Sequence, residues 1–76
     1  MEFEQVRDII VETLGVDAEQ VTPEASLTDD LGADSLALAE LMMAVEEASD
    51  ITIADEALED LKTVADVVAY LNANKA

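Results

Sequence analysis

The chain has 76 residues, which is the length of one domain, and we expect residues 1–76 to fold as a single unit. Nineteen acidic residues face three basic ones, so the formal net charge at pH 7 is -16. The absence of Cys and His excludes disulfides and zinc sites built from those ligands, and the scarcity of Lys and Arg argues against nucleic acid as a partner. Basic protein surfaces are the natural partners of so acidic a chain.

Apolar spacing predicts a first helix from Phe3 to Leu14. Val6 and Ile10 lie between these two residues at the i, i+3, i+4 intervals of one helical face. Gly15 follows directly and is well placed to end the helix as its C-cap.

A connection of about 20 residues follows, from Gly15 to Asp34, and connections of that length are often functional. Four apolar residues should anchor it over the core: Val16, Val21, Leu27 and Leu31. We expect a turn at Val21–Pro23, because a proline restricts the residue before it.

The second helix is predicted from Ser35 to Ser49. At 100° per residue its two faces separate clearly. The face toward the core carries Leu38, Leu41, Met42 and Val45. The outward face carries Leu36, Glu40, Met43 and Glu47, with Glu46 along the flank.

A short helix is expected from Asp55 to Glu59, after Ile51 and Ile53 enter the core. Thr63 and Asp66 form a capping box that opens the last helix. The core stripe of that helix is Val64, Val67, Val68 and Leu71, and Lys75 complements its C-terminus. The fold class is therefore all-α: a small four-helix bundle with three longer helices and one short helix.

The chain lacks the groups that catalysis near neutral pH usually needs. No His or Cys can activate the Ser35 hydroxyl, so a Ser-His-Asp arrangement has no second member. An EF-hand loop requires Gly at its sixth position and acids at its first, third and fifth, and neither Gly15 nor Gly32 satisfies this. No catalytic residue and no specific metal site is predicted, and a serine displayed without catalytic partners is typical of an attachment point.

The sequence around Ser35 resembles that of a known family, the acyl carrier proteins. The segment Leu31–Leu36, which reads Leu-Gly-Ala-Asp-Ser-Leu, matches their attachment motif. The pattern continues in the second helix at 40–41 and 43–47, in the loop at 23–25, and in the last helix from Thr63. The resemblance covers essentially the whole chain.

The resemblance implies that Ser35 carries 4′-phosphopantetheine, a covalent prosthetic group derived from coenzyme A. Its thiol would hold acyl intermediates as thioesters, and the protein would shuttle them between enzymes of fatty acid biosynthesis. The chain would be a non-catalytic, monomeric carrier and the substrate of a phosphopantetheinyl transferase. Acyl-processing synthase enzymes with basic patches would dock on Asp34, Leu36, Glu40, Met43, Glu46, Glu47, Asp55 and Glu56.

Two other functions remain open. A carrier for a polyketide, peptidyl or other specialised acyl pathway would keep Ser35 and change the cargo. An acidic interaction domain without modification would make Ser35→Ala silent, whereas the carrier function predicts complete loss of loading.

Two further expectations concern where an apolar acyl chain would lie and in which compartment the protein acts. An acyl chain gains about 0.8 kcal/mol for each CH₂ that leaves water. Flexible Met42 and small residues such as Ala65 and Ala69 suggest an expandable cavity between the second and last helices, with Val45 and Val68 also perturbed on acylation. No signal peptide and no membrane-spanning run are visible, so we expect a cytoplasmic protein without a membrane span.

Overall fold

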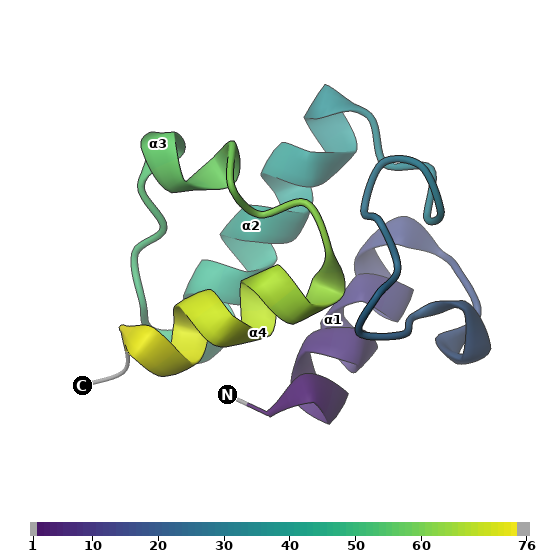
Figure 1. Ribbon diagram of the computed structural model, residues 1–76, viewed down its shortest axis with the longest axis horizontal. Coiled ribbons are helices and arrows are strands. Elements are labelled where there is room, and N and C mark those ends of the chain that lie inside the picture. Colours follow the sequence, from purple (N-terminus) through teal and green to yellow (C-terminus); the bar gives the residue numbers. More distant parts are fainter. Residues whose placement is uncertain (1, 75–76) are drawn as a thin grey trace.

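The computed structural model describes residues 2–74 and confirms the all-α fold class. Figure 1 shows three longer helices, one short helix and a long connection after the first helix. The elements in chain order are α1 (Phe3–Leu14), the 3₁₀ helix η1 (Ala18–Gln20), α2 (Ser35–Ser49), α3 (Asp55–Leu58) and α4 (Val64–Ala73). α1 packs against both α2 and α4, and the bounds of α1 and α2 are those predicted.

Local capping explains where these helices begin and end. At the start of α1 the Glu2 N–H donates to the Gln5 side-chain oxygen over 2.9 Å. Gly15 ends the helix in the left-handed conformation, with φ +70°, and its N–H donates to the Val11 carbonyl over 3.0 Å. A glycine adopts this conformation without the steric cost that a Cβ would bring.

The predicted capping box of the last helix is also confirmed. The Asp66 N–H donates to Thr63 Oγ1 over 3.2 Å, and Thr63 N–H donates back to Asp66 Oδ2 over 3.1 Å. Lys62 N–H donates to the same carboxylate oxygen over 3.1 Å. These backbone donors stabilise the charged form and lower the pKa of Asp66 below its ordinary value.

The core is aliphatic and is shared by all three longer helices. The described residues that it buries most completely are Val6, Ile10, Leu27, Leu41, Val45, Val64, Val67 and Leu71. Each such side chain contributes about 1.5–3 kcal/mol by leaving water. The predicted core faces of α2 and α4 are therefore right, although Leu38 and Val68 are only half-buried and pack at the edge of the core.

The long connection is anchored as predicted, but it is more ordered than the sequence indicates. Val21, Leu27 and Leu31 are buried and Val16 packs partly against the core. The turn lies at Thr22–Ala25, where Ala25 N–H donates to the Thr22 carbonyl over 3.0 Å, slightly later than expected. Pro23 takes the second position of this turn, which its fixed φ favours.

The connection also pairs with the start of α4, which nothing in the sequence predicts. Leu27 N–H donates to the Lys62 carbonyl over 2.9 Å, and Val64 N–H donates to the Ala25 carbonyl over 3.1 Å. An isolated antiparallel bridge joins Ser26 and Thr63. The bond from Val64 satisfies an N-terminal amide of α4, and the pairing as a whole fixes the loop that precedes the serine.

The segment between α2 and α4 differs slightly from expectation. α3 ends at Leu58, one residue early, because Asp60 and Leu61 close tighter i→i+3 bonds to Ala57 and Leu58. Ile53 is buried and Ile51 is half-buried. Lys75 and its predicted role at the helix C-terminus lie outside the described residues.

Candidate functional site

Ser35 is the first residue of α2, and its side chain is exposed. Two features of the preceding loop hold it there. Gly32 adopts φ +70°, and Ala33 is buried with its N–H donating to the Leu27 carbonyl over 3.0 Å. The buried alanine pins the loop to the core, so the chain presents the serine to solvent.

The start of α2 has unused backbone donors beside this hydroxyl. Asp34 is the N-cap, and its Oδ1 accepts from the Ala37 N–H over 2.8 Å. Among the hydrogen bonds of residues 2–74, none uses the N–H of Ser35 or Leu36. Free amides at a helix N-terminus, together with the helix dipole, suit a phosphate group attached at this position.

No group in the described part of the chain is placed to activate the serine. The Ser35 hydroxyl takes part in no hydrogen bond there, and the sequence contains no His or Cys. The geometry therefore displays a nucleophile but does not deprotonate it, which is the arrangement that an external modifying enzyme requires.

The outward face of α2 continues from this serine. Leu36 is 69% exposed and Met43 is 64% exposed, the two exposed large hydrophobic residues of the described chain. Glu40 and Glu47 are exposed on the same face. The structure thus brings together the four residues that the helical period placed on one stripe.

The other proposed docking acids are arranged differently. Asp34 and Glu56 are exposed, and Glu56 lies on α3 rather than α2. Asp55 begins α3, and its side chain is outside what the structure describes. Figure 1 shows α3 (green) away from the start of α2, where Ser35 lies.

Glu46 has a structural contact that sequence reasoning missed. It is half-buried, and its Oε2 accepts from the Ile53 N–H over 3.0 Å, across the end of the helix. No local sequence signal predicts a bond between residues on either side of a helix end. One oxygen of this carboxylate is therefore committed to holding the segment before α3.

The C-terminal end of α2 concentrates negative charge where it is unfavourable. Glu46 and Glu47 lie in the last turn, Asp50 is the C-cap, and the turn contains no basic residue. Negative charges near a helix C-terminus cost about 0.3–1 kcal/mol each at exposed positions. A cationic group placed nearby would reduce that cost.

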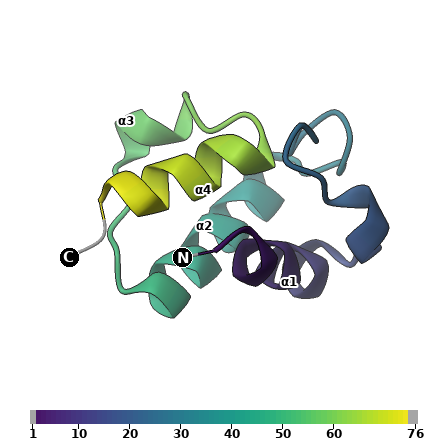
Figure 2. The same ribbon diagram turned by 60° about the horizontal axis from the view of Figure 1, so that its bottom comes forward.

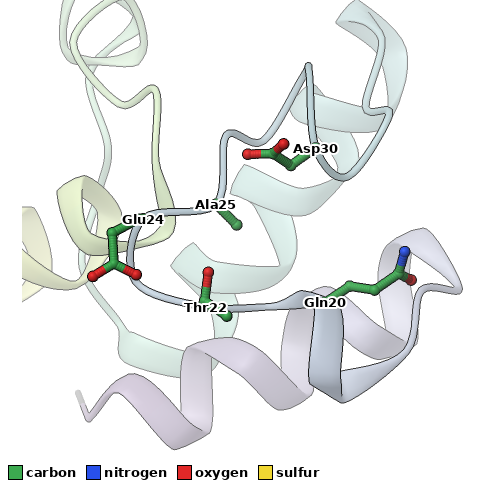
Figure 3. Close-up of a pocket in the computed structure, with 5 residues that line it drawn as sticks. All are labelled: Gln20, Thr22, Glu24, Ala25 and Asp30. Carbon is green, nitrogen blue, oxygen red and sulfur yellow. The ribbon is translucent and has the colours of Figure 1, made fainter.

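A polar depression of about 400 Å³ is formed by residues of the long connection. Figure 3 shows its lining residues, Gln20, Thr22, Glu24, Ala25 and Asp30, with the carboxylates of Glu24 and Asp30 directed to different sides of the loop. Asp30 Oδ2 accepts from the Ser26 N–H over 2.7 Å. No group of three or more acidic side chains in the described residues is arranged to hold a metal ion.

Within residues 2–74, no helix is long and apolar enough to cross a membrane.

Comparison with known proteins identifies the family. The phosphopantetheine attachment site family model matches residues 4–71. The chain is 56% identical over 72 residues to the acyl carrier protein of Syntrophobacter fumaroxidans, covering 95% of this chain and 89% of the relative. It is 61% identical over 67 residues to that of Bdellovibrio bacteriovorus, covering 88% and 86% of the two chains. A solved structure of acyl carrier protein from Enterococcus faecalis superposes with a TM-score of 0.76 at 30% identity, covering 99% of this chain and all of that one.

The chain belongs to the phosphopantetheine attachment family, among the acyl carrier proteins. Its prosthetic group is 4′-phosphopantetheine. The residues at the start of α2 fit such a group, since an exposed hydroxyl stands beside two unused amides.

Proposed function

We propose that Ser35 is the attachment point and that the protein carries acyl intermediates between enzymes of fatty acid biosynthesis. The arm supplies the thiol that this chain lacks and holds the acyl group as a thioester. The observation that supports the proposal most directly is the exposed serine at a helix start with free amides and no base nearby.

In this function the protein holds the acyl group and presents it to enzymes, and it does not itself catalyse a reaction. A phosphopantetheinyl transferase brings coenzyme A and the base that removes the Ser35 proton. The serine oxygen attacks the coenzyme A pyrophosphate and adenosine 3′,5′-bisphosphate leaves. The N-terminal amides of α2 then stabilise the negative charge of the phosphodiester that is formed on the serine. The absence of Cys suits the reducing cytoplasm, where we expect the carrier to act.

The outward stripe of α2 supports docking of the enzymes that load and process the cargo. Leu36 and Met43 are large apolar side chains in solvent, and such residues serve as contacts when a partner covers them. Glu40 and Glu47 beside them attract Lys and Arg, and rim charges of this kind mainly set encounter rate and specificity. A shuttle that visits many enzymes needs fast, reversible binding of this type.

Intact mass spectrometry tests the attachment site. The protein is incubated with coenzyme A, Mg²⁺ and a broad-specificity phosphopantetheinyl transferase, and its mass should increase by one phosphopantetheine unit. Ser35→Ala should show no increase, and Ser26→Ala, a serine of the preceding loop, should be loaded normally. Unchanged mass of the parent protein, or loading of Ser35→Ala, refutes the proposal.

The acyl groups that copurify with the protein test the pathway. Straight saturated and 3-hydroxy chains of increasing length support fatty acid synthesis. Aminoacyl or branched polyketide groups would instead assign a specialised pathway while leaving Ser35 as the attachment point.

A further inference from the structure

An apolar groove of about 300 Å³ opens between α1, α4 and the turn at Thr22–Ala25. All of its lining residues are apolar: Phe3, Pro23, Ala65, Val68 and Ala69. Phe3 and Val68 are half-buried and pack on the core, whereas the proline and the two alanines are exposed. The lining includes no residue of α2, so the groove is separate from the serine and from the outward stripe.

Backbone hydrogen bonds fix the walls of the groove. Ala65 N–H donates to the Pro23 carbonyl over 2.9 Å, which joins the turn to α4. Packing of α1 against α4 sets the opposite wall. Because these contacts are internal to the fold, a ligand meets a preformed site and binding costs little ordering of the protein.

Acidic residues adjoin two of the residues that line the groove, Phe3 and Pro23. Glu2 and Glu4 are exposed on either side of Phe3 in the chain, and Glu24 is exposed directly after Pro23. Figure 3 shows the Glu24 side chain as part of the polar depression, so its charge lies next to the groove and not inside it. The elements around the groove also carry two bases, Arg7 in α1 and exposed Lys62 before α4. The Arg7 guanidinium lies 3.2 Å from the Asp8 carboxylate, which partly offsets its charge.

An apolar lining within so acidic a molecule selects the occupant. A second copy of the chain brings a further charge of -16, and an anionic membrane surface is repelled in the same way. We propose that the groove is a second docking surface, which takes one apolar side chain from a basic segment of a partner protein. One apolar anchor in a preformed pocket, on a surface of complementary net charge, suits a small transient interface.

The position of the groove gives this surface its significance. Figures 1 and 2 both show α4 crossing in front of α2, and the groove between α4 and α1 takes no lining residue from α2. A partner seated between them leaves Ser35 and the outward stripe of α2 open to an enzyme. The carrier can therefore be held by one protein while its attachment site is used by another.

Amide chemical shifts measured during peptide titrations test the proposal. The probe is a short peptide of lysines around one central Phe, added to the full chain. Shift changes should saturate at Phe3, Ala65 and Ala69. A peptide with Ser in place of the Phe should bind there about tenfold more weakly, and a peptide with Glu in place of the lysines should not bind.

Two protein variants separate the groove from general attraction to acids. Ala69→Gln fills the groove and should weaken binding of the Phe peptide about tenfold. Ala48→Gln alters an alanine on α2 that is also exposed, and it should leave binding unchanged. With peptide at saturation, the transferase should still modify Ser35 at its normal rate, provided that Ser35 is modified at all.

Three results would overturn the inference. Shift changes confined to α2, or equal binding by parent and Ala69→Gln, would show that the peptide follows charge alone. Concentration-dependent shifts at Ala65 and Ala69 without peptide would assign the groove to a second copy. Failure of Ser35 loading would refute the carrier proposal and leave the groove result intact.

Discussion

Asp50 is the residue at which backbone strain and charge repulsion coincide. It ends α2 with φ 59° and ψ 29°, the left-handed region, and is the one non-glycine residue of the described chain with positive φ. Its carboxylate also follows Glu46 and Glu47 at the negative end of the helix dipole. Asp tolerates this conformation better than most residues, but it still carries the cost of a Cβ.

Replacing Asp50 by Gly should therefore stabilise the protein by about 1 kcal/mol, with Tm rising by about 4–8 °C. Thermal unfolding at constant salt measures the change. Asp50→Ala is the matched control, because it removes the charge and keeps the Cβ, so the difference between the two variants reports backbone strain. Equal stability of the two variants would show that strain at this position is negligible.

At the scale of elements, the sequence predicts what local rules determine. The helical period of the apolar residues and the capping residues predict the bounds of α1 and α2 and the capping box of α4. The same period predicts the exposed stripe that runs from Ser35 along α2. The contacts that the sequence does not reveal are tertiary. The pairing of the long connection with the start of α4 depends on how distant segments pack, and so does the apolar groove.

The bond between Glu46 and Ile53 is such a tertiary contact, and it ties α2 to the segment before α3. Glu46→Ala removes the acceptor, so the Ile53 amide should exchange with solvent about five to ten times faster, as expected for loss of about 1 kcal/mol. Hydrogen exchange followed by NMR gives the rate. Glu47→Ala, one residue along and exposed, should leave the Ile53 rate unchanged. If both variants accelerate exchange equally, the effect is one of overall charge.

Asp66 makes the start of α4 sensitive to pH. Its pKa is lowered first by backbone donors at Thr63 and Lys62, so it binds protons more readily in the unfolded chain than in the folded one. Its contribution to stability is therefore complete above its ordinary pKa of 3.8 and is lost as pH falls through the lower folded value.

Comparison with Asp66→Asn isolates this contribution from the other acids. The stability difference between parent and variant, measured by urea unfolding, should be constant from pH 7 to about 5 and should shrink below about pH 4. The amide keeps an acceptor oxygen, so the variant should still fold. A difference that stays constant down to pH 2.5 would show that the charge of Asp66 contributes nothing.

At the scale of the whole molecule, dense negative charge opposes a small core. The described chain has a Cα radius of gyration of 10.9 Å and longest dimension of 30 Å, so most of its acids lie within a few Debye lengths of one another. The whole chain carries a net charge of -16, and of its three bases only Arg7 is seen in an ion pair within the described part. This charge favours encounters with basic partners while lowering the stability of the folded state.

Stability should consequently rise with ionic strength. Between 10 mM and 300 mM NaCl at pH 7, screening should raise the free energy of unfolding by about 1 kcal/mol and Tm by about 4–8 °C. Near the isoelectric point of about 4.1 expected from the sequence the net charge vanishes, so the same salt increase should have a much smaller effect. Calorimetry at the two pH values measures both responses. Self-repulsion requires net charge, so its screening cannot raise Tm equally at both pH values. An equal gain in Tm at pH 7 and pH 4.1 would assign the effect to specific ion binding or to salting out instead.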